Sequence, residues 1–354
     1  MSRPDRGGPR AHVRVPAKIN LALRVGGRRP DGYHGLATVF LAVSIEDDVV
    51  AVGTPAAPGR PGTITAEVSG EGADEIGPGR DNLAVRAAEL LRDRLGRPEL
   101  GVSLSIAKRI PVTGGMAGGS ADAAGALVAC AKVWGIDAGP AELGALAAEL
   151  GADVPFPLLG GCALGLGRGD RLTPVLCRGP FWWVLAVAGA PLSTAEVFRR
   201  FDRLGAGGSK VAPGPAVGPV AQGGGGAAGV RRPAPADVTR SGLAAPAIEP
   251  AGVPPALLEA LAAGDAVRLG ASLVNDLEPA ARSLMPTLGR TLEAGHEAGA
   301  LGAVVAGSGP TVAFLAADET AARQLAVRLS SEGVARALRL ARGPVPGARL
   351  VAGA

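Results

Sequence analysis

The 354 residues predict two domains plus a tail or linker. The three cysteines have no CxxC or His-paired metal spacing, so neither a disulfide framework nor a zinc site is indicated. Hydrophobic residues make up 47% of the chain but aromatic residues only 3%, so we expect a core built largely from Leu, Val and Ala. The 36 Lys and Arg against 32 Asp and Glu give a net charge of +4, too small to indicate nucleic-acid binding.

The first 29 residues carry several basic side chains and a single acid, Asp5. A local positive field of this kind favours anionic partners such as phosphorylated metabolites. Residues 1–10 are interpreted as a disordered basic tail. Because this segment has no apolar core, a secretory signal is excluded, and no apolar run in the chain is long enough to span a bilayer. We therefore expect a cytoplasmic protein without a membrane partner.

The N-terminal half mixes strands and helices, and it is assigned to a domain covering residues 11–180. Near-alternating apolar residues predict strands over 12–23, 38–52 and 100–106. Apolar positions at helical spacing predict helices over 82–95, 121–134 and 141–150. Asp81 is expected to cap the first helix, and Gly151 to end the third.

The C-terminal half, residues 181–345, is interrupted at about 205–255 by a Gly-, Pro- and Ala-rich stretch. That composition buries too little apolar area to offset its ordering entropy, so we interpret the stretch as a disordered insertion. Strands are predicted over 181–188, 300–305 and 312–315 and at the end of the domain, with helices over 256–273, 288–298 and 319–333. The order of elements indicates an α+β fold.

The strongest local motif is PVTGGMAGGSADAAG, residues 111–125, because four glycines within six residues separate a strand from a helix. Such a turn lets backbone amides and the positive end of the helix bind phosphate oxygens. Neither GxxxxGK[ST] nor GxGxxG occurs here, so a P-loop ATPase and a dinucleotide-binding fold are disfavoured. Taken alone, a glycine-rich turn is as often structural as functional.

Further motifs occur in a fixed order along most of the chain. They are PAKINL (16–21), DGYH (31–34), DNL (81–83), GADVP (151–155), NDLE (275–278) and GSGPT (307–311). With the glycine loop, this set resembles the GHMP kinases, and within them the diphosphocytidyl-methylerythritol kinase branch. The resemblance implies an α+β, two-domain GHMP kinase. Its N-terminal domain would be like domain 2 of ribosomal protein S5 and its C-terminal domain ferredoxin-like, with the active site in the cleft between them.

The resemblance also implies an activity: ATP-dependent phosphorylation of the 2-hydroxyl of a cytidylated methylerythritol, in the non-mevalonate pathway of isoprenoid biosynthesis. Asp153 would accept the proton of the substrate hydroxyl, while Lys18 keeps that carboxylate ionised and orients the hydroxyl. The alternative, purely structural roles are a helix cap for Asp153 and a solubilising charge at a strand edge for Lys18.

ATP is the expected phosphate donor, and Mg²⁺ is the expected metal. The predicted ATP-binding residues are Pro111, Val112, Thr113, Gly114, Gly115, Met116, Ala117, Gly118, Gly119, Ser120 and Ala121. Ala121 stands where the commoner loop has a second serine, which leaves Ser120 as the possible hydroxyl ligand of the metal. The sequence does not determine the full ligand set.

The substrate is predicted to bind through the DGYH motif and the GSGPT loop. Tyr33 offers a stacking face for cytosine, His34 a polar contact and Phe198 a second aromatic wall, with Asn20 as a further polar candidate. Gly307, Ser308 and Gly309 would close over the other end of the substrate. Each aromatic residue could instead fill a gap in the core, and GSGPT could be a plain hairpin turn.

Two alternatives stay open. Another GHMP kinase, such as a homoserine or mevalonate kinase, would share the glycine loop but not the DGYH element. A non-catalytic nucleotide or RNA binder would need an aromatic platform interleaved with cations, which this composition hardly offers. We expect a small-molecule substrate and no nucleic-acid partner, while the oligomeric state cannot be inferred.

Overall fold

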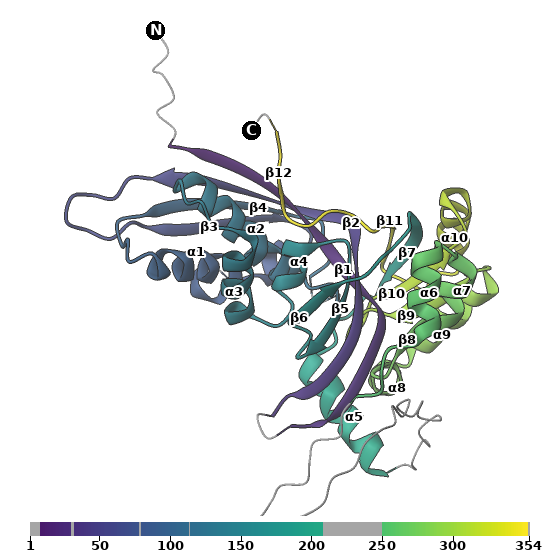
Figure 1. Cartoon of the computed structure of the whole chain (residues 1–354). Coiled ribbons are helices and arrows are strands. Elements are labelled where there is room, and N and C mark those ends of the chain that lie inside the picture. The colour runs from purple at the N-terminus through teal and green to yellow at the C-terminus, as the bar shows by residue number, and fades with distance from the viewer. Residues whose placement is uncertain (1–7, 30–31, 78, 113, 208–249, 353–354) are drawn as a thin grey trace, which may run out of the picture.

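The computed structural model describes residues 8–352 except 30–31, 78, 113 and 208–249. Most of the predicted basic tail and of the predicted insertion, together with Thr113, therefore lies outside the described residues. The described elements form two halves, each a sheet covered by helices (Figure 1).

The first half is built on an eight-stranded sheet. Its main path runs β12-β1-β2-β4-β3, while β5 pairs with β2 and β6, and β8 pairs with β1. The strands are β1 (Arg10–Arg28), β2 (His34–Thr54), β3 (Ile64–Gly70), β4 (Gly101–Lys108), β5 (Cys162–Gly167), β6 (Arg171–Pro174), β8 (Val274–Asn275) and β12 (Arg349–Leu350). The helices of this half are α1 (Leu83–Arg94), α2 (Gly118–Val133), α3 (Pro140–Leu150) and α4 (Pro155–Leu159), with short 3-10 turns at Ala73–Glu75 and Gly79–Asp81.

The second half is built on a four-stranded antiparallel sheet in the order β11-β7-β10-β9. Its strands are β7 (Phe181–Val187), β9 (Gly302–Val305), β10 (Val312–Ala316) and β11 (Ala337–Gly343). Its helices are α5 (Thr194–Gly207), α6 (Pro255–Ala263), α7 (Ala266–Ser272), α8 (Glu278–Leu284), α9 (Thr287–Glu297) and α10 (Glu319–Ser331).

Strands β1 and β2 join the two halves, since these long strands run from one half of the molecule into the other (Figure 1). Register shifts interrupt their pairing between Pro16 and Ala17 and again between Asn20 and Ala22. Pro16 lacks a backbone donor and so fits beside such an irregularity. Near Ala22, β1 also pairs in parallel with β8, which brings the second half alongside. The PAKINL motif therefore lies where the halves meet.

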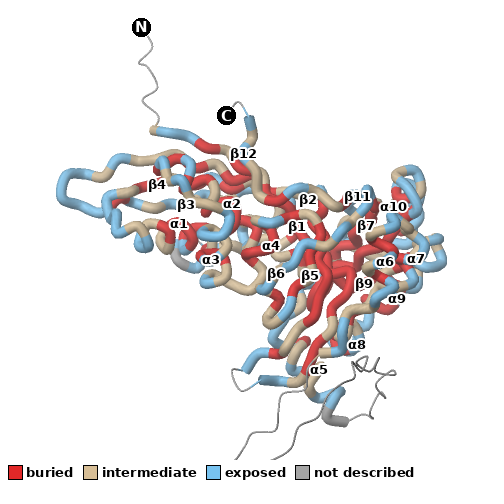
Figure 2. Tube along the Cα trace, in the orientation of Figure 1, coloured by how far each residue is buried: buried red, intermediate tan, exposed pale blue. Residues whose placement is uncertain are grey.

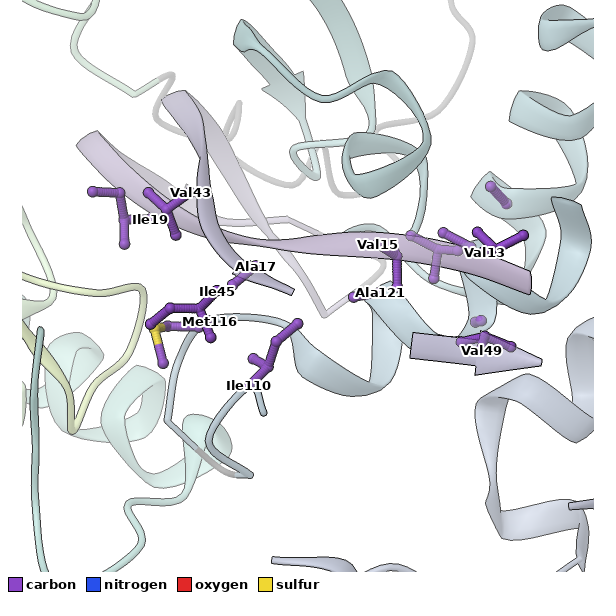
Figure 3. Close-up of a cluster of buried hydrophobic side chains, with 14 of the residues drawn as sticks. Val13, Val15, Ala17, Ile19, Val43, Ile45, Val49, Ile110, Met116 and Ala121 are labelled. Atoms are coloured by element: carbon purple, nitrogen blue, oxygen red, sulfur yellow. The ribbon is translucent and has the colours of Figure 1, made fainter. Parts of the chain in front are cut away.

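Helix α2 packs tightly on β1 and β2 because its inner face consists of small residues. A Cβ atom added at Gly125 would lie 2.9 Å from a methyl group of Val49 and 3.3 Å from one of Val15. Figure 3 shows Val15, Val49 and Ala121 within one cluster of buried side chains, and Figure 2 shows how continuously the central strands are buried. The expected core of Ala, Val and Leu is confirmed.

The structure corrects several details of the sequence prediction. Asn82, not Asp81, caps α1, because its side chain accepts a hydrogen bond from the amide of Ala84. The predicted helix over 256–273 is two helices, since Gly264 adopts a left-handed conformation with φ of 73° and Asp265 caps a new start. Strands β3, β5 and β6 and helices α5 and α8 were not predicted. None of the helices in the described ranges combines the length and apolar character that a bilayer crossing requires.

Candidate active site

A cavity of about 560 Å³ lies between the two halves. The glycine loop and β1 line it from the first half, while α5 and the GSGPT loop line it from the second. The predicted residues that line it are Lys18, Asn20, Pro111, Val112, Gly114, Gly115, Ala117, Gly118, Gly119, Asp153, Phe198, Gly307, Ser308 and Gly309. Sequence reasoning and the fold thus bring most of the candidate residues to one cavity.

The glycine loop leads from β4 to the start of α2 at Gly118. Gly115 and Ala117 have φ angles of 75° and 59°, so the backbone is left-handed at both positions. At Gly115 a Cβ atom would lie only 2.1 Å from the carbonyl oxygen of Ala306, so the loop needs glycine there to touch the second half. The loop therefore places the amino end of α2 at the cavity, where unpaired helix amides favour an anion.

Lys18 is buried in β1, and its ammonium group is held by neighbours on two elements. Nζ donates to Asn20 Oδ1 at 2.9 Å and to the carbonyl oxygen of Gly115 at 3.1 Å. The Nδ2 group of Asn20 donates in turn to Thr38 Oγ1 at 2.8 Å, and Thr38 donates to the carbonyl oxygen of Ala22 at 2.7 Å. This relay fixes the cation beside the glycine loop.

Asp153 follows α3, just before α4, and its half-buried side chain lines the same cavity as Lys18. The residue that caps α4 is Val154, not Asp153. Among the described residues no ion pair within 4.0 Å joins Asp153 to Lys18, whose hydrogen bonds go to Asn20 and Gly115. The two groups therefore line one cavity without forming an ion pair with each other.

Lys108, Asp47 and Asp122 form a buried charge cluster at the cavity wall that the sequence did not predict. Lys108 Nζ lies 2.5 Å from Asp47 Oδ2 and 2.6 Å from Asp122 Oδ2, and all three side chains are at most 5% exposed. Asp47 also accepts the amides of Arg109 and Ile110, so it fixes the start of the glycine loop. These residues are 61 and 14 positions from Lys108, and no local pattern in the sequence links them.

The cluster holds two acids against one base. Burial is the main cause that raises the pKa of Asp122, to about 7, against the opposing charge of Lys108. Burial by itself would lower the pKa of Lys108, but the charges of Asp122 and Asp47 outweigh it and raise that pKa. Lys108 is therefore a cation, and Asp122 is only partly ionised near neutral pH because two buried carboxylates share one ammonium group.

The GSGPT loop is held by the NDLE motif. Asn275 donates both amide hydrogens, to the carbonyl oxygens of Val305 and Gly307, each at 2.7 Å, and its Oδ1 accepts from the amide of Leu277 at 2.9 Å. Ser308 Oγ lies 2.8 Å from Thr194 Oγ1 at the start of α5. The loop is thus fixed against the cavity from two sides.

The three residues predicted to contact the cytosine, Tyr33, His34 and Phe198, occupy different positions relative to the cavity. Phe198 on α5 lines the cavity, and the His34 ring stacks on it at 5.0 Å between centroids. His34 Nε2 lies 2.7 Å from Asp202 Oδ1, and the imidazole is buried behind Phe198 and is not part of the lining. Tyr33 is 56% exposed with the Arg168 guanidinium 5.7 Å from its ring centroid, and it does not line the cavity.

The remaining loop positions do not line the cavity either. Met116 is 1% exposed and accepts the backbone amide of Lys18 through its carbonyl oxygen. Ala121 lies on the buried face of α2 and packs in the core (Figure 3), so a hydroxyl at this position would face the core. Ser120, the predicted candidate for the metal, is absent from the lining. Along the described part of α2, Asp122 brings the carboxylate that lies on the cavity wall.

Known proteins match the chain over nearly its full length. The family patterns for the GHMP kinases N terminal domain and GHMP kinases C terminal match residues 82–161 and 257–335. A protein of Streptomyces avermitilis named 4-diphosphocytidyl-2-C-methyl-D-erythritol kinase is 49% identical, covering 96% of this chain and 99% of that protein. One of the same name from Nocardia farcinica is 48% identical, covering 96% and 95%.

Solved structures agree with this assignment. A crystal structure of 4-(cytidine 5'-diphospho)-2C-methyl-D-erythritol kinase matches with a TM-score of 0.65 and 32% identity, covering 93% of this chain and 98% of the other. The homoserine kinase of Cytophaga hutchinsonii gives a TM-score of 0.66 at 15% identity, covering 99% and 100%, and shares the fold alone. The predicted two-domain α+β fold is confirmed, and the chain belongs to the 4-diphosphocytidyl-2-C-methyl-D-erythritol kinase family of GHMP kinases.

Proposed function

We propose that this chain transfers the γ-phosphoryl group of ATP to the 2-hydroxyl of 4-diphosphocytidyl-2-C-methyl-D-erythritol. The relatives bear the name of that kinase, and the activity is consistent with the residues on the cavity. The observation that carries the proposal is the placement of Lys18 and Asp153 on one cavity with the amino end of α2. A hydroxyl and a phosphoryl group can meet between these three features.

ATP would bind with its phosphates at the glycine loop. Gly118 and Gly119 offer the first backbone amides of α2 to phosphate oxygens. Ile76, Leu83 and Val112 line the cavity on the same side and supply apolar surface for a purine ring. The phosphate chain would then extend from this apolar end toward Lys18.

In the transfer step, the substrate oxygen forms a bond to the γ-phosphorus while the bond from that phosphorus to the β,γ-bridging oxygen breaks, which releases ADP. Asp153 accepts the hydroxyl proton as the new bond forms. Lys18 has a third N–H beyond the two that Asn20 and Gly115 engage, and this N–H can stabilise charge on the phosphoryl oxygens. A divalent cation bound with ATP would neutralise further phosphate charge.

The substrate would enter from the side of α5 and the GSGPT loop. Phe198 offers an aromatic face there, and His34 stacks behind it to fix the ring. The amides and hydroxyl of Gly307 to Gly309 are hydrogen-bond partners for the polar end of the substrate. Tyr33, which is exposed, would have to move to contact the cytosine.

The test measures ADP release with the cytidylated methylerythritol, homoserine and mevalonate as parallel acceptors. We expect turnover with the first acceptor only, and a fall in kcat of about 10²–10⁴-fold in Asp153→Asn because the proton acceptor is lost. The variant should keep its melting temperature and its affinity for ATP. Near-normal turnover in Asp153→Asn would remove this residue from the mechanism, and preference for another acceptor would overturn the substrate assignment.

A further inference from the structure

Asp122 combines three properties that its structural surroundings leave unexplained. It is 4% exposed, it lines the cavity near the start of α2, and its Oδ1 has no hydrogen-bond partner among the described residues. Its other oxygen, Oδ2, binds Lys108 at 2.6 Å. A buried polar atom without a partner costs about 1–3 kcal/mol, so its presence on a cavity wall needs an explanation.

The charge balance of the cluster indicates which kind of partner is missing. Asp47 and Asp122 share the single cation Lys108, so in this buried setting both carboxylates can be fully ionised together only when a further cation is bound. Asp47 uses its Oδ1 to accept two backbone amides, whereas Oδ1 of Asp122 accepts nothing among the described residues. The atom that lacks a positively charged partner is therefore Oδ1 of Asp122.

The helix geometry places this carboxylate beside the proposed phosphate site. Gly118 and Asp122 are four residues apart on α2, so they lie on the same helix face. A Cβ atom at Gly118 would approach Lys108 Nζ to 3.3 Å, which shows how closely the cluster lies under the first turn of α2. A cation at Asp122 would thus be near phosphates bound at that turn.

We propose that Asp122 binds the divalent cation that accompanies the nucleotide, with Oδ1 as the protein ligand beside phosphate oxygens and water. Mg²⁺ in nucleotide sites commonly uses one or two carboxylates together with substrate phosphates. The described residues contain no group of three or more acidic, His or Cys side chains that could hold a metal without the nucleotide. The inference rests on the proposed function, because the nucleotide must supply the other ligands.

The experiment titrates Mn²⁺ by EPR against the protein saturated with β,γ-imido-ATP. Asp122→Asn keeps the shape of the side chain, and we expect it to weaken Mn²⁺ binding by about tenfold or more. Its affinity for β,γ-imido-ATP without metal should be unchanged or higher, because a negative charge near the phosphates is removed. Asp81→Asn is the matched control, since Asp81 is an exposed acid on the same cavity and should change Mn²⁺ binding little.

Two further measurements separate ligation from stability. Asp122→Cys should bind Cd²⁺ better than Mn²⁺ in the presence of the analogue, because thiolate is a soft ligand. The wild-type protein labelled with ¹³C-aspartate should show carboxylate ¹³C coupling to bound Mn²⁺ in an ENDOR spectrum, and this test needs no variant.

The possible outcomes have distinct meanings. Unchanged Mn²⁺ binding in Asp122→Asn, an equal loss in Asp81→Asn, or a wild-type spectrum without ¹³C coupling would each overturn the role of Asp122. If the wild-type protein fails to bind β,γ-imido-ATP at all, the proposed function itself fails, which distinguishes the two.

Discussion

Thr38 is the residue on which the relay beneath Lys18 depends. Its hydroxyl accepts from Asn20 Nδ2 and donates to the carbonyl oxygen of Ala22, so it is buried with both roles in use. Thr38→Val has nearly the same volume but leaves these two groups unpaired, which should cost about 1–3 kcal/mol in the free energy of unfolding. Because Asn20 then no longer fixes Lys18, we expect kcat to fall by about ten- to a hundredfold.

Urea unfolding and steady-state kinetics check both expectations. Thr291→Val is the matched control, because the Thr291 hydroxyl is also buried and hydrogen-bonded to backbone. It shares its hydrogen between the carbonyl oxygen of Thr287, in the same helix α9, and that of Val334, which follows α10. This control should lose a similar amount of stability while kcat stays unchanged. If Thr38→Val also keeps its kcat, the relay does not position Lys18 for the reaction.

At the residue level, the site residues that belong to short contiguous motifs could be predicted from the sequence. Lys18, Asp153, Phe198 and the glycine loop each belong to a contiguous sequence pattern, and the three side chains and most of the described loop line the cavity. Asp47, Lys108 and Asp122 were missed because their contacts depend on how β2, β4 and α2 assemble. The signal in the sequence was Asp122 itself, an acid in an otherwise Ala- and Gly-rich helix start.

At the element level, α9 and β10 are in such close contact that glycine is required between them. A Cβ atom at Gly295 would lie 1.9 Å from Cε1 of Phe314, which is itself fully buried and cannot move aside. We expect Gly295→Ala to lower the free energy of unfolding by about 1–3 kcal/mol through overpacking, as measured by thermal or urea unfolding.

Another glycine of the same helix supplies the control. At Gly289 the nearest atom to an added Cβ is the guanidinium of Arg282 at 3.3 Å, the flexible end of a side chain. Gly289→Ala should be neutral or stabilise the protein by up to about 1 kcal/mol, because alanine has the higher helix propensity. Equal destabilisation in both variants would contradict the packing argument.

Elements were predicted correctly where a hydrophobic pattern extends over many residues. They were missed where the element is short, or where part of a helix faces the cavity and not the core. The strand over 181–188 and the helix over 319–333 agree with β7 and α10 to within two residues at each end. By contrast, α5 carries Phe198 toward the cavity and follows loop-like residues, so its helical pattern was not recognised. Strands β5 and β6 are short, and two of the six residues of β5 are glycine, which weakens a strand signal.

On the scale of the whole molecule, the end of the chain returns to its beginning. Strand β12 pairs with β1, with Arg349 opposite Arg14, and Arg349 makes two hydrogen bonds to the Glu46 carboxylate on β2. Next to Glu46 on the same strand region, Asp48 accepts hydrogen bonds from His12, Arg14 and Arg109. A polar network thus joins β1 and β12 to β2 and, through Arg109, to the end of β4, where the glycine loop begins.

This network predicts a pH dependence of stability. Burial alone would raise the pKa of Asp48, but the hydrogen bonds from His12, Arg109 and Arg14 outweigh it and lower the pKa below the ordinary 3.8. For an acid with a lowered pKa, the ionised form stabilises the folded state. The contribution is therefore fully present above pH 3.8 and is lost as the pH falls through the lower, folded-state value.

Asp48→Asn should reduce the free energy of unfolding by about 1 kcal/mol at pH 7, since the partner arginines are partly exposed. Below pH 3.8 the difference from the wild type should shrink, because the wild-type carboxylate protonates as well. Urea unfolding at a series of pH values measures this difference, with Asp93→Asn as the control because that carboxylate is 73% exposed. A difference that stays constant from pH 7 to pH 3 would show that Asp48 acts by shape and hydrogen bonding alone, and that its charge does not hold the two chain ends together.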